Sequence, residues 1–137
     1  MFRHIGIVVN DIEKMLWFYR DILSLDVMYD EIEQGEFLNH ILNTKNESPR
    51  IIKLGINNST VVELLDFNKL YTSPKKELLD KGYTHFALTV NDCDGIYSKL
   101  KLNNLKTINY PVVSNNGVKV FFGVDPEDNI IEFVELL

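Results

Sequence analysis

The chain has 137 residues, of which 45% are hydrophobic and 25% are charged, with seven Gly and four Pro. These proportions are typical of one globular domain, and this length buries about two-thirds of the unfolded surface, so a core needs no disulfide or structural metal. Twenty acidic against fourteen basic residues give a net charge of −6. This balance disfavours nucleic acid as a partner, because phosphate backbones are bound by clustered Lys and Arg.

Cysteine content and hydropathy indicate the compartment. The single cysteine, Cys93, excludes an internal disulfide and favours a reducing compartment, so we expect a cytoplasmic protein. The N-terminal residues lack the long apolar run and small-residue cleavage site of a signal peptide. Since no run approaches the ~18 apolar residues that span a bilayer, we expect no membrane partner.

The N-terminal half begins with a strand followed by a helix. Residues 4–9 (HIGIVV) are apolar and β-branched, which predicts a buried strand. Asp11 is a good helix N-cap, and apolar residues at three- and four-residue spacing predict a helix that runs to Leu23. The polar segment after the second strand predicts a short helix or a functional loop at residues 36–42. Further strands are predicted at residues 27–31, 51–56 and 61–65, with a hairpin turn at Asn57-Asn58-Ser59.

The same pattern begins again after a linker at residues 69–81 that is rich in Lys, Ser and Pro. HFALTV at residues 85–90 predicts a strand, and Ile96 and Leu100 mark an amphipathic helix. Strands are predicted at residues 106–110, 119–124 and 129–136. The chain is therefore interpreted as module 1 at residues 1–68, the linker, and module 2 at residues 82–137.

The two modules are related by an internal repeat. HIGIVVND at residues 4–11 aligns with HFALTVND at residues 85–92, with an offset of 81 residues. VVELL at residues 61–65 aligns with IIEFV at residues 130–134, with an offset of 69, so the first module is 12 residues longer. The repeat predicts an α+β fold built from two pseudo-symmetric β-α-β-β-β modules.

Each module contributes one His at the start of its first strand and one Glu within its last strand. These residues are His4 and Glu63, then His85 and Glu132. A carboxylate among apolar neighbours is costly to bury unless it is paired. Two imidazoles and two carboxylates that point inward offer four ligands to a divalent metal and leave up to two octahedral positions open. His40 has no counterpart in the repeat, and we expect it to be structural or exposed.

Four segments resemble the vicinal oxygen chelate superfamily, above all its members similar to glyoxalase I and methylmalonyl-CoA epimerase. These segments are HIGIVVNDIEKMLWFYRDIL, STVVELLDF, THFALTVNDCDGIYSKL and FFGVDPEDNIIEFVEL. The ending resembles the family pattern D-P-x-G-N-x-I-E-L, with Asp128 in place of Gly at a turn position that tolerates left-handed backbone. The resemblance implies a curved, partly open mixed sheet around one divalent ion, which is Ni, Co, Zn, Mn or Fe. Its ligands would be His4, Glu63, His85 and Glu132.

The resemblance also implies a reaction. Lyase and epimerase members remove a proton next to a carbonyl and stabilise the resulting enediolate on the metal. In this chain Glu132 would be the base, and Glu63 would handle the other proton. The expected substrate is a small carbonyl compound, a thiol conjugate or a CoA ester, and the expected assembly is a homodimer. Glutathione-dependent glyoxalases typically carry an Arg in the first strand, which HIGIVV lacks.

Two alternative functions stay open. An extradiol-type dioxygenase uses two His and one carboxylate on iron, and Glu63 would fill a position that such enzymes keep open. A non-catalytic, drug-binding resistance protein commonly lacks the four-ligand set. The aromatic residues and the third His that are candidates for lining a pocket, with core packing as the alternative, are Phe37, His40, Tyr110 and Phe121 or Phe122.

Overall fold

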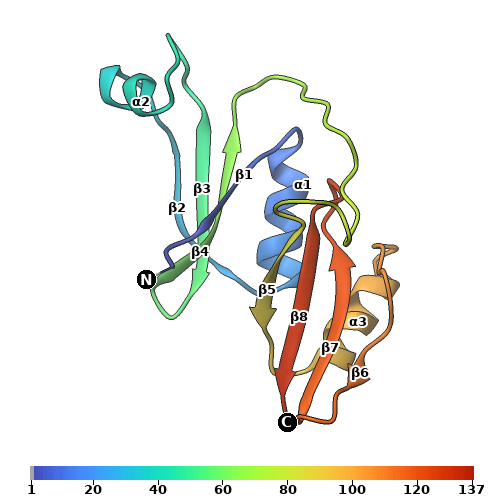
Figure 1. Cartoon of the computed structure of the whole chain (residues 1–137). Coiled ribbons are helices and arrows are strands. Elements are labelled where there is room, and N and C mark those ends of the chain that lie inside the picture. The colour runs from blue at the N-terminus through green and yellow to red at the C-terminus, as the bar shows by residue number, and fades with distance from the viewer. Residues whose placement is uncertain (1) are drawn as a thin grey trace. The chain divides into compact units, whose positions relative to one another are not determined.

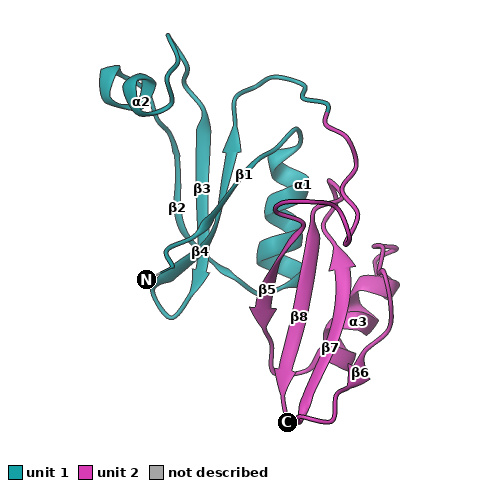
Figure 2. Ribbon diagram, viewed as in Figure 1, with its two compact units in different colours: residues 1–72 teal, residues 73–137 magenta. Residues whose placement is uncertain are grey.

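The computed structural model describes residues 2–137 and divides the chain into two compact units (Figure 2). Unit 1 ends at Thr72 and unit 2 begins at Ser73. Unit 1 contains β1 (Ile5–Val8), α1 (Ile12–Trp17), the π-helix η1 (Phe18–Ile22), β2 (Asp26–Ile32), α2 (Glu36–Ile41), β3 (Arg50–Ile56) and β4 (Ser59–Asp66). Unit 2 contains β5 (His85–Thr89), α3 (Cys93–Leu102), β6 (Val112–Val113), β7 (Val118–Val124) and β8 (Ile130–Leu136).

Both units have the same strand topology. The sheet of unit 1 has the order β1-β4-β3-β2, and the sheet of unit 2 has the order β5-β8-β7-β6 (Figure 1). In unit 1 β1 runs parallel to β4, and in unit 2 β5 runs parallel to β8. The remaining neighbouring pairs are antiparallel. The predicted pair of β-α-β-β-β modules is therefore confirmed, as two four-stranded mixed sheets that are not closed.

The first helix of each unit begins at an aspartate cap. The Asp11 carboxylate accepts a hydrogen bond from the Lys14 backbone N–H at 3.0 Å, and Asp92 accepts one from Gly95 N–H at 2.8 Å. The helix predicted to run to Leu23 continues from α1 into η1. Because the π-helix closes i→i+5 turns, it holds more residues per turn than an α-helix. The adjacent Phe18 and Tyr19 are both fully buried in this element.

The additional residues of the first module form the predicted short helix, α2. It lies beyond the ends of β2 and β3, away from α1 (Figure 1). Asn39 organises the loop around it, since its amide nitrogen donates to the Gly35 carbonyl at 3.0 Å. Its amide oxygen accepts from Thr44 Oγ1 and from Glu47 N–H, both at 2.9 Å. This hydrogen bonding gives the polar segment a defined shape.

The turns follow the predicted chemistry. Asn57 and Asn58 have φ of 51° and 62°, as the two-residue hairpin between β3 and β4 requires. Asp128 has φ of 65°, so it adopts the left-handed conformation that the family pattern gives to Gly. Asp125, before it, is buried, and its carboxylate accepts hydrogen bonds from Glu127 N–H and Asn129 N–H.

The prediction of a strand at residues 106–110 is wrong. Thr107 forms only an isolated bridge to Gly123, and the strand of this region is β6, which is two residues long. The backbone N–H of Phe122 donates to the side-chain oxygen of Asn109 at 2.7 Å. A side chain thus takes the place of a main-chain acceptor, so a regular ladder does not form here.

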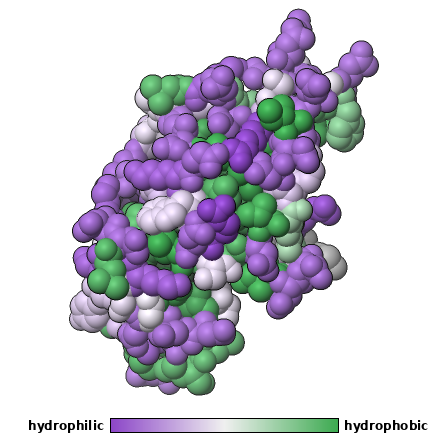
Figure 3. Space-filling view, turned by 180° about the vertical axis from the view of Figure 1, so that it is seen from behind, coloured by the Kyte–Doolittle hydropathy of each residue, from purple (hydrophilic) through white to green (hydrophobic). Residues whose placement is uncertain are grey.

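Each unit has its own apolar interior. In unit 2 the rings of Phe121 and Phe133 stack with centroids 4.8 Å apart, so Phe121 belongs to the core. The fully buried members of unit 1 include Met15, Phe18, Tyr19, Ile52, Leu54, Val62 and Leu64. Hydrophilic residues predominate on the face shown in Figure 3, with smaller hydrophobic areas between them. None of the helices within residues 2–137 is long and apolar enough to cross a membrane.

Candidate metal centre

Unit 1 brings His4 and Glu63 together. Parallel pairing of β1 with β4 sets Gly6 opposite Glu63, and His4 lies two residues before Gly6, which places it on the same face of the sheet. Nε2 of His4 lies 3.2 Å from Oε2 of Glu63, and the two side chains are 25% and 17% exposed. The pair is thus partly shielded from water but still reachable.

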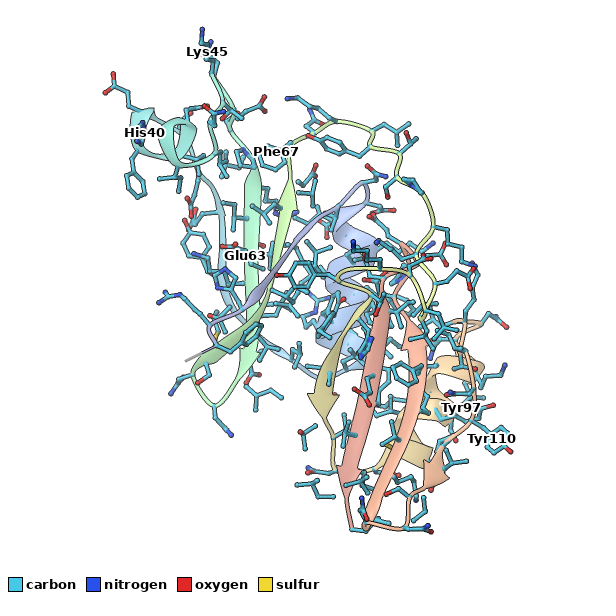
Figure 4. The ribbon with its side chains drawn as sticks, in the orientation of Figure 1. His40, Lys45, Glu63, Phe67, Tyr97 and Tyr110 are labelled. Carbon is cyan, nitrogen blue, oxygen red and sulfur yellow. The ribbon has the colours of Figure 1, made fainter. Side chains whose placement is uncertain are left out.

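Strand alternation explains how a carboxylate fits within an apolar strand. Val62 and Leu64 on β4 are fully buried in the core, whereas Glu63 between them points to the opposite, partly open face. Gly6 adds space on that face, since a Cβ built there would lie 3.8 Å from Oε2 of Glu63. Figure 4 shows Glu63 on its strand. The apolar sequence around Glu63 therefore does not force it into the hydrophobic core.

One nitrogen of this pair has no hydrogen-bond partner. Nδ1 of His4 is buried, and within residues 2–137 it finds no donor or acceptor. A buried polar atom left unsatisfied costs about 1–3 kcal/mol and calls for an explanation such as an unseen water or ion. The nitrogen that faces Glu63 is Nε2, and an imidazole nitrogen beside a carboxylate oxygen is a donor set that suits a divalent ion.

Unit 2 repeats the pair with His85 and Glu132. Register sets Ala87 of β5 opposite Glu132 of β8, as Gly6 lies opposite Glu63. Nε2 of His85 lies 3.6 Å from Oε2 of Glu132, and the side chains are 34% and 26% exposed. Nδ1 of His85 lies 2.9 Å from the Thr84 hydroxyl. Such a partner on the far nitrogen fixes the ring orientation of metal-binding histidines.

Of three neighbours of these pairs, Lys53 and Tyr29 were missed in the sequence, whereas Phe122 was named only as a candidate for lining a pocket. Nζ of Lys53 lies 3.5 Å from Oε1 of Glu63 and 4.8 Å from the ring centroid of Tyr29. The ring of Phe122 meets the ring of His85 edge-on, with centroids 5.2 Å apart. The available signal was the repeat itself, because Lys53 and Phe122 are separated by the same 69-residue offset as the two glutamates.

The structure thus places the four predicted ligands as two pairs, one in each unit. Among residues 2–137 the structure does not gather three or more His, Cys, Asp or Glu side chains into one ligand set. Each pair combines an imidazole nitrogen with a carboxylate oxygen, a donor set that suits Ni, Co, Zn, Mn and Fe alike. The chemistry of the two pairs therefore agrees with a divalent metal.

The third histidine lies elsewhere in unit 1. His40 is on α2, well away from Glu63 on β4 (Figure 4). It lines an open concavity of about 1110 Å³ formed by residues 34–48, together with the exposed Phe37 and Lys45. His40 is exposed, and it does not join the His4 and Glu63 pair.

Comparisons with known proteins agree with this architecture. A family model described as the Glyoxalase/Bleomycin resistance protein/Dioxygenase superfamily matches residues 2–133. A glyoxalase family protein from Bacillus cereus is 18% identical, with a TM-score of 0.88 over 99% of this chain and 93% of that one. The trypanothione-dependent glyoxalase I of Leishmania major is 21% identical, with a TM-score of 0.68 over 96% and 84% of the two chains.

A lactoylglutathione lyase from Agrobacterium tumefaciens is 15% identical, with a TM-score of 0.62 over 98% of this chain and 92% of that one. At these identities the likeness shows a shared fold. No curated protein sequence matches the chain at a significant level.

Proposed function

Because this chain belongs to the Glyoxalase/Bleomycin resistance protein/Dioxygenase superfamily, we propose that it is a metal-dependent lyase, isomerase or epimerase that moves a proton next to a carbonyl group. The observation that carries the proposal is the recurrence of one His–Glu pair at the same place in both units, His4 with Glu63 and His85 with Glu132. A single charged pair on a sheet face can be incidental. Two pairs at equivalent positions of a repeat support a common purpose.

The four side chains would hold one divalent ion. When bound, such an ion stabilises negative charge that develops on a carbonyl oxygen. The Thr84 contact of His85 supports this assignment, because a partner on Nδ1 orients the ring while Nε2 faces Glu132. The proposed substrate is a small carbonyl compound, which includes thiol conjugates and CoA esters.

The proton is moved by the carboxylates of the chain. Glu132 takes the proton from the carbon next to the carbonyl, and in a lyase or isomerase it returns that proton to the neighbouring carbon. In an epimerase, Glu63 delivers the proton on the opposite face. A positioned carboxylate of this kind contributes about 10²–10⁴-fold to the rate. The half-buried position of both side chains limits competition from water.

Metal content and proton exchange test the proposal. Protein purified without added ions is expected to contain about one divalent ion, and His4→Ala and Glu132→Gln are expected to lose most of it. His40→Ala is the matched control, because this exposed histidine lies on α2, outside the pairs. Unchanged metal content in both site variants would contradict the proposed centre.

Turnover is measured separately, as deuterium exchange into a panel of 2-oxo thiohemiacetals and 2-methyl-acyl-CoA esters. Exchange with the first group indicates a lyase, and exchange with the second an epimerase. Oxygen uptake with catechols under ferrous iron would instead indicate a dioxygenase. Tight binding of an antibiotic without any exchange would indicate a sequestering protein.

A further inference from the structure

The two carboxylates of the proposed centre have unequal neighbours. Antiparallel pairing sets Lys53 of β3 opposite Glu63, and it sets Phe122 of β7 opposite Glu132. Both partners lie ten residues before their glutamate, so they are equivalent positions of the repeat. Unit 1 therefore places an ammonium group beside its carboxylate, and unit 2 places an aromatic ring there.

The two oxygens of Glu63 face different partners. Oε2 lies 3.2 Å from Nε2 of His4, and Oε1 lies 3.5 Å from Nζ of Lys53. Partners that bind the second oxygen of a metal-ligating carboxylate orient it and are nearly as important as the ligand itself. Lys53 thus keeps Oε2 on the side of His4, where the proposed ion would be held.

Lys53 is itself held in place. Its Nζ lies 4.8 Å from the ring centroid of Tyr29, within the range of a cation–π contact. Tyr29 is the register partner of Lys53 on β2, so Gly6, Glu63, Lys53 and Tyr29 form one row across the four strands. With its side chain only 30% exposed, Lys53 is a supported part of this face and not a freely moving surface lysine.

Glu132 has no such support. Within Ser73–Leu137 its ion-pair partner is His85 alone, at 3.6 Å, and no cation lies opposite it. Phe122 occupies that place, and its ring packs edge-on against His85. An aromatic ring neither donates to the carboxylate oxygens nor fixes their orientation, so the carboxylate of Glu132 is less constrained than that of Glu63.

We propose that Lys53 is a positioning residue that orients Glu63 to hold the metal ion, and that Glu132, which has no such partner, is the carboxylate that first removes the proton. This assignment rests on the proposed function. It makes the two halves of a pseudo-symmetric site chemically distinct through one Lys-to-Phe difference. It also predicts that removal of the Lys53 charge weakens metal binding, whereas removal of the charge of a lysine in an ion pair outside both His–Glu pairs does not.

Titration of the metal-free protein with Co²⁺, followed by its visible absorption, tests this assignment. Lys53→Met keeps the length of the side chain and removes the charge, and it is expected to weaken Co²⁺ binding by about 10–100-fold and to alter the absorption spectrum. Lys53→Arg restores a cation beside Oε1 and is expected to recover most of the affinity. Lys53→Gln replaces Lys53→Met if circular dichroism shows that the latter does not fold.

Lys119→Met is the matched control. Lys119 is also a half-buried strand lysine in an ion pair, with Nζ 2.6 Å from Asp94, but it lies outside both His–Glu pairs. Its substitution is expected to leave Co²⁺ affinity and the spectrum unchanged. If folded Lys53→Met or Lys53→Gln binds Co²⁺ as tightly as the wild type or more tightly, the inference alone is overturned. Failure of the wild type to bind Co²⁺ would instead overturn the proposed function.

Discussion

At the scale of single residues, surroundings decide which polar side chains are available for chemistry. Cys93 is fully buried, and its Sγ donates to the Lys119 carbonyl at 3.4 Å and to the Phe133 carbonyl at 3.6 Å. Burial, followed by the nearby Glu135 carboxylate, raises the pKa of its thiol to about 11. Because the thiolate is the reactive form, Cys93 is inert at neutral pH.

We predict that Cys93 does not react with a thiol-specific disulfide reagent in the folded protein at about pH 8, and that it reacts fully in denaturant. The folded pKa lies above the unfolded value of 9.0. The contribution of the thiol to stability is therefore complete below pH 9 and is lost as the pH rises towards 11. Unfolding by denaturant across this range measures the decline, and Cys93→Ala is expected to flatten it. Rapid labelling of the native protein would contradict the prediction.

Residue type also explains why the partners of the two glutamates are less evident in the sequence than the glutamates themselves. The glutamates are conspicuous because each interrupts an apolar strand. Lys53 and Phe122 are not, because a lysine or a phenylalanine in a strand is ordinary. Only the register between β3 and β4 shows that Lys53 faces Glu63, and only the side-chain conformations show that its charge reaches Oε1.

At the scale of elements, the hairpin of β3 and β4 positions Glu63 and Lys53. Its turn was predicted from Asn57-Asn58, and both residues adopt the expected positive φ. Just before the turn the register shifts between Leu54 and Gly55. A Cβ on Gly55 would lie 1.9 Å from the Ser59 carbonyl oxygen, so the close approach of the two strands requires glycine there.

We predict that Gly55→Ala destabilises the protein by about 2–3 kcal/mol, because the clash is with backbone that cannot move without disturbing the hairpin. Gly6→Ala is the matched control, since its Cβ would meet only side-chain atoms at 3.6 and 3.8 Å. We expect this control to stay within about 0.5 kcal/mol of the wild type. Chemical denaturation measures both variants, and equal stabilities would contradict the assigned role of Gly55.

At the scale of the whole molecule, the internal repeat gives both units the same sheet topology. Two sheets of the same topology each carry one His–Glu pair. A ligand that binds only the folded protein stabilises it in proportion to the logarithm of its concentration over Kd. The metal is therefore expected to raise the free energy of unfolding above the value that burial of the apolar core alone provides.

We predict that a divalent ion at about 100 times its Kd adds about 2.7 kcal/mol of stability, or roughly 10 °C in the unfolding midpoint, and that a chelator reverses the gain. Calorimetry of the metal-free and metal-loaded protein measures the shift. The double variant Glu63→Gln/Glu132→Gln is expected to show the same midpoint in both states. A full shift in this variant would show that the ion binds elsewhere.

Sequence patterns alone predict the repeat, the two capped helices, most strands and the residues of both His–Glu pairs. These features are local, since periodicity, aspartate caps and asparagine turns act over a few residues. That Lys53 faces Glu63 and that Thr84 contacts His85 becomes evident only from the fold. These contacts depend on strand register and side-chain packing, which bring together residues that are far apart in sequence or fix conformations that residue type does not specify.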